Sequence, residues 1–69
     1  MEFKPDNGVM EFLDELCEFD RDEPIKTKIS YKGVWFEFDE IRKLVNNRTL
    51  LGEGLYSIVE RMYLLSRDN

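Results

Sequence analysis

Histidine is absent from this 69-residue chain, and cysteine occurs once, at Cys17. Without histidine, the chain lacks the commonest general base and the commonest metal ligand in proteins. A single cysteine cannot form an internal disulfide, so we expect a reducing, cytoplasmic setting. Cys17 falls on the apolar side of a predicted helix, among carboxylates. Burial and nearby negative charge both raise the pKa of a thiol, which predicts an inert core residue rather than a nucleophile.

Long apolar runs, phosphate-binding loops and metal-binding patterns are missing as well. No stretch approaches the roughly 20 apolar residues of a membrane span, and residues 1–8 lack the apolar segment of a signal peptide. The GEG sequence at 52–54 lacks the lysine and the preceding strand of a phosphate loop. The acids of residues 20–23 lack the spacing and the glycine turn of a calcium loop. We therefore predict no catalytic residue, metal or cofactor, and no membrane association.

An amphipathic helix is predicted over Gly8–Asp20, with Asp6 or Asn7 as its N-cap. At about 100° per residue, one side of this helix is apolar and consists of Val9, Met10, Leu13, Leu16 and Cys17. The opposite side carries four carboxylates, those of Glu11, Asp14, Glu15 and Glu18. Two aromatic residues seven positions apart lie at the edge of the apolar side, namely Phe12 and Phe19. Three more acids continue the acidic run beyond this surface: Asp20, Asp22 and Glu23.

A β-hairpin is predicted next, with strands over residues 25–31 and 34–39 and a two-residue turn at Lys32 and Gly33. Apolar and polar side chains alternate in both strands, and this alternation sets the register. On the apolar face the predicted pairs are Tyr31 with Val34, Ile29 with Phe36, and Thr27 with Phe38. On the other face they are Ser30 with Trp35, Lys28 with Glu37, and Lys26 with Asp39. The register therefore places two lysines opposite two acids. Because these lysines are engaged within the hairpin, we expect the acidic side of the first helix to have no internal partner.

Two further helices complete the predicted fold. One covers Asp39–Asn46, and the other covers residues 50–67 with Thr49 as its N-cap and glycines at 52 and 54 that weaken its first turn. The apolar stripe of the last helix consists of Leu51, Leu55, Ile58, Val59, Met62 and Leu65. The predicted architecture is α+β, in the order helix, strand, strand, helix, helix. It is a two-stranded antiparallel hairpin packed against three helices in a single domain, 1–69.

Self-association is expected because a chain this short buries only about 60% of its unfolded surface. We predict a homodimer whose surface lies on the last helix, where two tyrosines flank the apolar stripe and one leucine lies outside it. These residues are Tyr56, Tyr63 and Leu64.

The negative charge is concentrated in the first third of the chain. Residues 1–23 carry a net charge of −7, residues 24–48 carry +3 and residues 49–69 carry −1. The acidic helix side is either an ordinary solvated surface or a surface for a basic partner. An ordinary helix surface mixes charges of both signs, whereas no lysine occurs between Pro5 and Ile25. This favours the second interpretation, in which closely spaced carboxylates imitate the phosphates along a DNA strand.

Two other functions stay open. A small adaptor or regulatory protein would bind an enzyme or polymerase through apolar residues, namely Trp35, Tyr56 and Tyr63. The register leaves Trp35 either covered by its neighbours or exposed as an interface anchor. A DNA-binding regulator would use Arg42, Lys43 and Arg48. The pI near 4.6 opposes direct nucleic-acid binding.

In its size, its lack of histidine and its acidic run from Glu11 to Glu23, the chain resembles a class of small bacteriophage proteins. These proteins inhibit DNA-binding proteins of the bacterial host by imitating DNA, and some of them target the nucleoid-associated protein HU. The resemblance implies a non-enzymatic inhibitor in the cytoplasm of an infected bacterium, with a basic DNA-binding protein as its partner.

Overall fold

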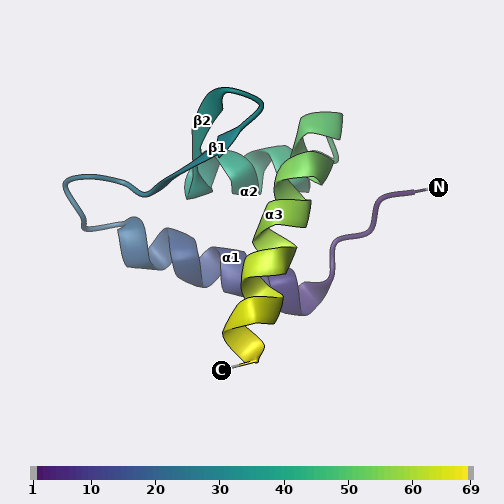
Figure 1. The fold of residues 1–69 in the computed structure, drawn as a ribbon, viewed down its shortest axis with the longest axis horizontal. Helices are drawn as coiled ribbons and strands as arrows, with labels where there is room; N and C mark the ends of the chain where they lie inside the picture. Colours follow the sequence, from purple (N-terminus) through teal and green to yellow (C-terminus); the bar gives the residue numbers. More distant parts are fainter. Residues whose placement is uncertain (1, 69) are drawn as a thin grey trace.

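Three helices and one antiparallel hairpin follow one another in the predicted order (Figure 1). The computed structural model describes residues 2–68. Its elements are α1 Asn7–Asp20, β1 Lys28–Tyr31, β2 Val34–Glu37, α2 Phe38–Asn46 and α3 Leu50–Arg67. The α+β architecture predicted from the sequence is therefore confirmed. No helix within residues 2–68 combines the length and the apolar character needed to cross a bilayer.

Helix α1 is closed at both ends by side chains. The Asp6 carboxylate accepts a hydrogen bond from the Val9 backbone N–H at 3.2 Å, as expected of an N-cap. At the other end, the Lys26 ammonium donates to the backbone carbonyls of Asp20 and Arg21. A cation at this end complements the helix dipole. Lys26 therefore stabilises the end of α1. The pairing of Lys26 with Asp39 that the hairpin register predicted is wrong.

The hairpin has the predicted register over four residue pairs, from Tyr31 opposite Val34 to Lys28 opposite Glu37. Both turn residues have positive φ, 51° at Lys32 and 81° at Gly33, as a primed two-residue turn requires. Among the described residues, Lys28 and Glu37 face each other without an ion pair.

The two outer strand pairs predicted from the alternation, Thr27 with Phe38 and Lys26 with Asp39, are wrong. Strand β2 ends at Glu37 because α2 begins at the next residue. The Glu37 backbone N–H donates to the Glu40 carboxylate at 3.1 Å, which is one half of a capping box. The chain therefore turns into a helix before the outer pairs can form.

The connection from α2 to α3 is tight. The Thr49 hydroxyl accepts from the Gly52 N–H at 2.9 Å and caps α3, as predicted, while it donates to the Leu44 carbonyl at 3.0 Å. A Cβ atom on Gly52 would lie 2.3 Å from that same carbonyl oxygen. Gly52 is therefore what allows α3 to approach α2, and the helix is regular from Leu50 onward.

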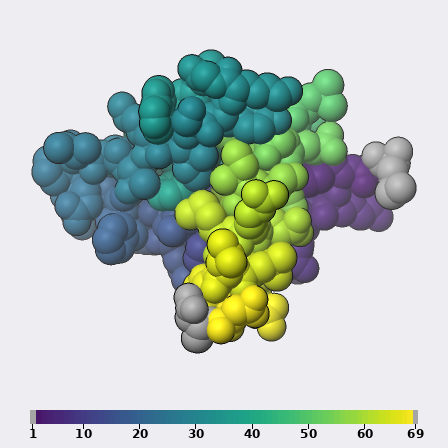
Figure 2. Space-filling model, in the orientation of Figure 1, coloured from purple at the N-terminus to yellow at the C-terminus, as the bar shows by residue number. Residues whose placement is uncertain are grey.

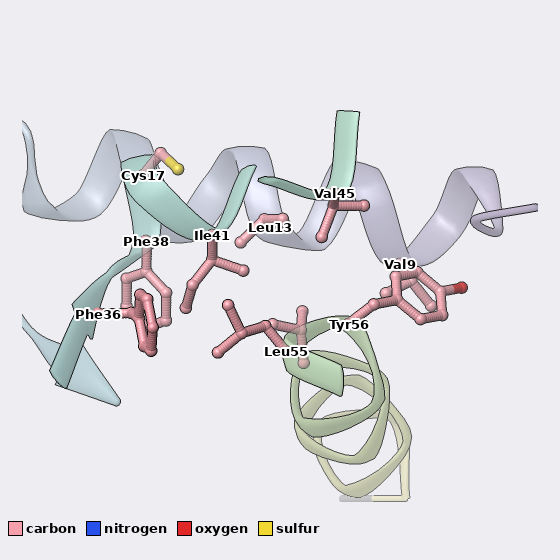
Figure 3. Packing of buried hydrophobic residues seen from close by; sticks show 10 residues of the cluster. Val9, Leu13, Cys17, Phe36, Phe38, Ile41, Val45, Leu55 and Tyr56 are labelled. Atoms are coloured by element: carbon pink, nitrogen blue, oxygen red, sulfur yellow. The ribbon is translucent and has the colours of Figure 1, made fainter. Parts of the chain in front are cut away.

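The core lies where the three helices meet, with β2 closing one side (Figure 3). Its fully buried centre consists of Leu13, Ile41, Val45, Leu55 and Val59. The last core residue of α3 is Val59, eight residues before the helix ends. Met62 and Tyr63 still pack partly against the core, and the last turn of α3, from Leu64 onward, extends past it. In Figure 2 this end of α3, in yellow, lies at the bottom of the view.

Candidate partner-binding surface

The four predicted carboxylates of α1 all lie on its exposed side, opposite the buried Val9, Leu13 and Cys17. We call this surface the acidic face; it consists of Glu11, Asp14, Glu15 and Glu18. At 1.5 Å per residue it extends for roughly 10 Å along the helix axis.

Two carboxylates of the acidic face have partners within the chain. The Asp14 carboxylate lies 3.3 Å from the Arg42 guanidinium, and the Glu18 carboxylate lies 2.8 Å from that of Arg21. This corrects the expectation that the face has no internal partner. Both pairs are exposed, and exposed pairs contribute at most about 1 kcal/mol.

The other two carboxylates, Glu11 and Glu15, make no ion pair with any residue among 2–68. They lie four residues apart, one turn of α1, and both are exposed. Like charges at this spacing repel each other and destabilise an isolated helix by a few tenths of a kcal/mol. The part of the acidic face that can accept an external cation therefore centres on these two residues.

The predicted extension of the acidic run is only partly on the surface. Asp20 is buried, with 5% of its surface exposed, and its carboxylate accepts hydrogen bonds from the Thr27 backbone N–H at 2.8 Å and the Thr27 hydroxyl at 3.0 Å. Asp20 therefore anchors the loop that leads to β1 and does not extend the acidic face. Asp22 and Glu23 are exposed in that loop.

The three aromatic residues predicted as apolar contacts differ in how far they are buried. Phe12 is half-buried against the ring of Tyr63, with centroids 5.6 Å apart. Phe19 is 74% exposed at the end of α1, and Trp35 is 65% exposed on the hairpin. Of the two interpretations of Trp35, the structure therefore favours an exposed side chain.

The predicted dimer surface needs a correction at Tyr56. This residue is 7% exposed, and its hydroxyl accepts a hydrogen bond from the Asp6 N–H at 2.8 Å. The Phe3 ring packs edge-on against it at 5.1 Å. Tyr56 therefore belongs to the core of the chain and is not a free surface for an adaptor or a dimer. Leu64 is 51% exposed on the projecting part of α3.

The basic residues considered for DNA binding are mostly engaged elsewhere. Arg42 contacts both Asp14 and Asp39, and its hydrogen bond to Asp14 raises the pKa of its guanidinium. Arg48 donates to the carbonyls of Val45 and Asn46. Only Lys43 of the three extends into solvent without a partner among the described residues.

Cys17 has the environment predicted for an inert thiol. Burial raises its pKa to about 11, and a hydrogen bond with Asp39 adds to the shift. Within residues 2–68, no three side chains of the metal-binding types lie close enough to share an ion.

A groove of about 250 Å³ lies beside the acidic face, between α1 and the end of α3. Helix α1 lines it with Gly8, Glu11, Phe12 and Glu15, and α3 contributes Tyr63, Ser66 and Arg67. Sequence reasoning missed this groove because it assigned Phe12 and Tyr63 to separate surfaces. Only the crossing of the two helices brings these side chains together.

Comparisons with protein-family models, with curated proteins and with solved structures find no match to this chain. The function is therefore argued from the sequence and from the arrangement of residues in the structure.

Proposed function

We propose that this chain is a non-enzymatic inhibitor that binds a basic DNA-binding protein, of which HU is an example, and blocks its contact with DNA. The observation that carries the proposal is the pair of exposed carboxylates of Glu11 and Glu15, which make no ion pair within residues 2–68. A basic groove that normally holds phosphates would bind these carboxylates in their place.

The remaining acids support the same reading. Asp14 and Glu18 are held by arginines in exposed pairs, and such weak pairs can be exchanged for contacts with a partner at little cost. Asp22 and Glu23 lie exposed beyond the helix and lengthen the negative surface. A field of one sign speeds the encounter with an oppositely charged partner and makes binding sensitive to salt.

Self-association is part of this proposal. Leu64 and Leu65 are exposed on the turns of α3 that extend past Val59, where a second copy can cover them. A dimer would present two acidic faces to one partner. Sedimentation equilibrium should give a dimer for the unaltered chain and a monomer for the double variant Leu64→Ser, Leu65→Ser.

The direct test is displacement of HU from a labelled DNA duplex, followed by gel shift at low salt. The unaltered chain should release the DNA, and the double variant Glu11→Lys, Glu15→Lys should not. The matched control is Glu2→Lys, Glu60→Lys, which makes the same change of charge at exposed positions away from the acidic face. Equal loss of activity in both double variants would mean that net charge alone causes the displacement. This result would contradict the proposal that the acidic face is the binding surface.

A second candidate function is supported by a different observation. Trp35 and Phe19 are large aromatic side chains that are mostly exposed, and exposed tryptophan is typical of interface hot spots. In this case the chain is an adaptor that binds an enzyme or polymerase through apolar contacts.

Salt separates the two candidates. At about 1 M salt the Debye length falls to about 3 Å, so a complex held by the acidic face should dissociate. A complex held by Trp35 should persist at this salt concentration. Trp35→Ser should abolish that complex, and Val34→Ser, a change at a neighbouring exposed position, should weaken it less.

A further inference from the structure

The groove between α1 and α3 has an aromatic wall. The rings of Phe12 and Tyr63 lie 5.6 Å apart at a tilt of 54°. Tyr63 reaches this position because residue 8 is a glycine: a Cβ atom there would lie 2.7 Å from the Tyr63 hydroxyl oxygen. The wall is therefore built by residues from both helices, and it depends on their crossing.

The α1 side of the groove is also negatively charged. Glu11 and Glu15 line it, and neither has an ion-pair partner among the described residues. Carboxylates beside aromatic faces form a favourable environment for a cation, because the faces of aromatic rings carry partial negative charge.

The chain itself already places one cation on this wall. The Arg67 guanidinium lies over the Tyr63 ring, 5.5 Å from its centroid. It makes no ion pair with Glu11 or Glu15, although all three residues line the groove. The lining still carries a net negative charge, since two carboxylates face one guanidinium.

The size of the groove restricts its ligand. About 250 Å³ lies below the roughly 300–1,000 Å³ of small-molecule sites, so one extended side chain suits it better than a cofactor. We propose that the groove receives a lysine side chain of the basic partner, with its stem along Phe12 and Tyr63 and its ammonium between Glu11 and Glu15. This inference rests on the proposed function and adds to it a defined contact point.

The probe for this site is the peptide pentalysine, with penta-acetyllysine as its neutral counterpart. A titration at low ionic strength, followed by NMR of the labelled chain, should shift the amide signals of Gly8 and Ser66. The neutral peptide should leave them in place. A titration in which pentalysine shifts only loop signals, such as those of Asp22 and Glu23, would overturn the proposal.

Two pairs of variants distinguish binding of pentalysine in the groove from general attraction between opposite charges. Ser66→Trp fills the groove without changing any charge, and Ser57→Trp is its control at an exposed position on the same helix outside the groove. Ser66→Trp should weaken pentalysine binding by about two- to fivefold, the size of one cation–π contact of roughly 0.5–1 kcal/mol. Ser57→Trp should leave it unchanged.

The second pair removes one positive charge. Arg67→Ala frees the Tyr63 ring from its internal cation, whereas Arg61→Ala removes the same charge from an exposed position outside the groove. Pentalysine should bind more tightly to the Arg67 variant than to the Arg61 variant. Equal affinities in this pair, or no effect of Ser66→Trp, would each contradict a lysine in the groove.

The HU displacement assay keeps this inference apart from the proposed function. If Ser66→Trp still displaces HU while Glu11→Lys, Glu15→Lys does not, the acidic face acts without the groove and only the inference fails. If the unaltered chain leaves HU on its DNA while Ser66→Trp weakens pentalysine binding, the groove is a lysine site and the proposed function fails.

Discussion

The guanidinium of Arg42 on α2 lies 3.3 Å from the carboxylate of Asp14 on α1, across 28 residues of sequence. This contact makes Arg42 the one positive side chain from another element that is paired with the acidic face, among the residues that the structure describes. It also connects the charge on α1 to the packing of α2 against it.

Arg42→Gln is expected to strengthen binding of a basic partner, because it frees the Asp14 carboxylate and removes a positive charge beside it. The free energy of unfolding should fall by no more than about 2 kcal/mol, since Arg42 loses two exposed pairs, with Asp14 and Asp39, of at most about 1 kcal/mol each. Affinity for HU and urea unfolding measure the two effects. Lys43→Gln is the control, because it removes the same charge from the same helix at an unpaired position. If both variants bind HU with the same affinity, the pair with Arg42 does not limit the contribution of Asp14 to binding.

Asp20→Ala is expected to lower the free energy of unfolding by about 1–3 kcal/mol, because the Thr27 N–H and hydroxyl lose their buried acceptor. Urea unfolding monitored by circular dichroism measures this cost. Asp22→Ala, at an exposed position in the same loop, should change stability by less than about 0.5 kcal/mol. Similar stability of the two variants would show that the loop does not depend on Asp20.

Gly52→Ala is expected to destabilise the protein, although helix propensity alone favours alanine by about 1 kcal/mol. The added Cβ would meet the backbone carbonyl oxygen of Leu44 at 2.3 Å, and backbone cannot move aside as a side chain can. Overpacking of this kind costs about 1–3 kcal/mol. A thermal melt should therefore show a lower Tm for Gly52→Ala, and no such loss for Ser57→Ala on the exposed side of the same helix. A higher Tm for the Gly52 variant would contradict the close approach of α2 and α3.

Stability is expected to fall as the pH rises from about 9 to about 11, in part because of Cys17. Its thiol has a pKa of about 11 in the folded chain against 9.0 as the ordinary value, so the unfolded chain loses this proton first. The unfolded state therefore binds fewer protons than the folded state in this range, and the free energy of unfolding decreases with pH.

Urea unfolding at pH 8 and pH 10.5 measures this loss, and the variant Cys17→Ala isolates the contribution of the thiol. The decrease should be smaller in the variant. An identical decrease in both chains would mean that the thiol ionises in the folded state as readily as in the unfolded one.

Local patterns were sufficient to predict most of the fold. The alternation in the hairpin fixed the four inner strand pairs, and the apolar spacing of α1 identified its buried side. The outer pairs failed because Glu37 and Glu40 favour a helix start over two more strand pairs. The alternation of apolar and polar residues alone does not indicate where a helix start replaces further strand pairs.

The candidate site was harder to predict, because its details depend on contacts between distant segments. Asp20 belongs to an acidic run by sequence, yet Thr27 draws it inward once the loop folds back. Tyr56 lies beside an apolar stripe, yet the segment before α1 covers it through Asp6 and Phe3. The groove exists only where α1 and α3 cross, so no single segment indicates it.

The hydrogen bond between Asp6 and Tyr56 joins residues 50 positions apart, one just before α1 and the other on α3. During synthesis the segment before α1 must therefore wait until α3 has been made. At about 5–20 residues per second this delay is roughly 3–10 s. Throughout that time the first helix carries its carboxylates without the support of its final neighbours. The acidic face should thus reach its final surroundings only after α3 has been synthesised.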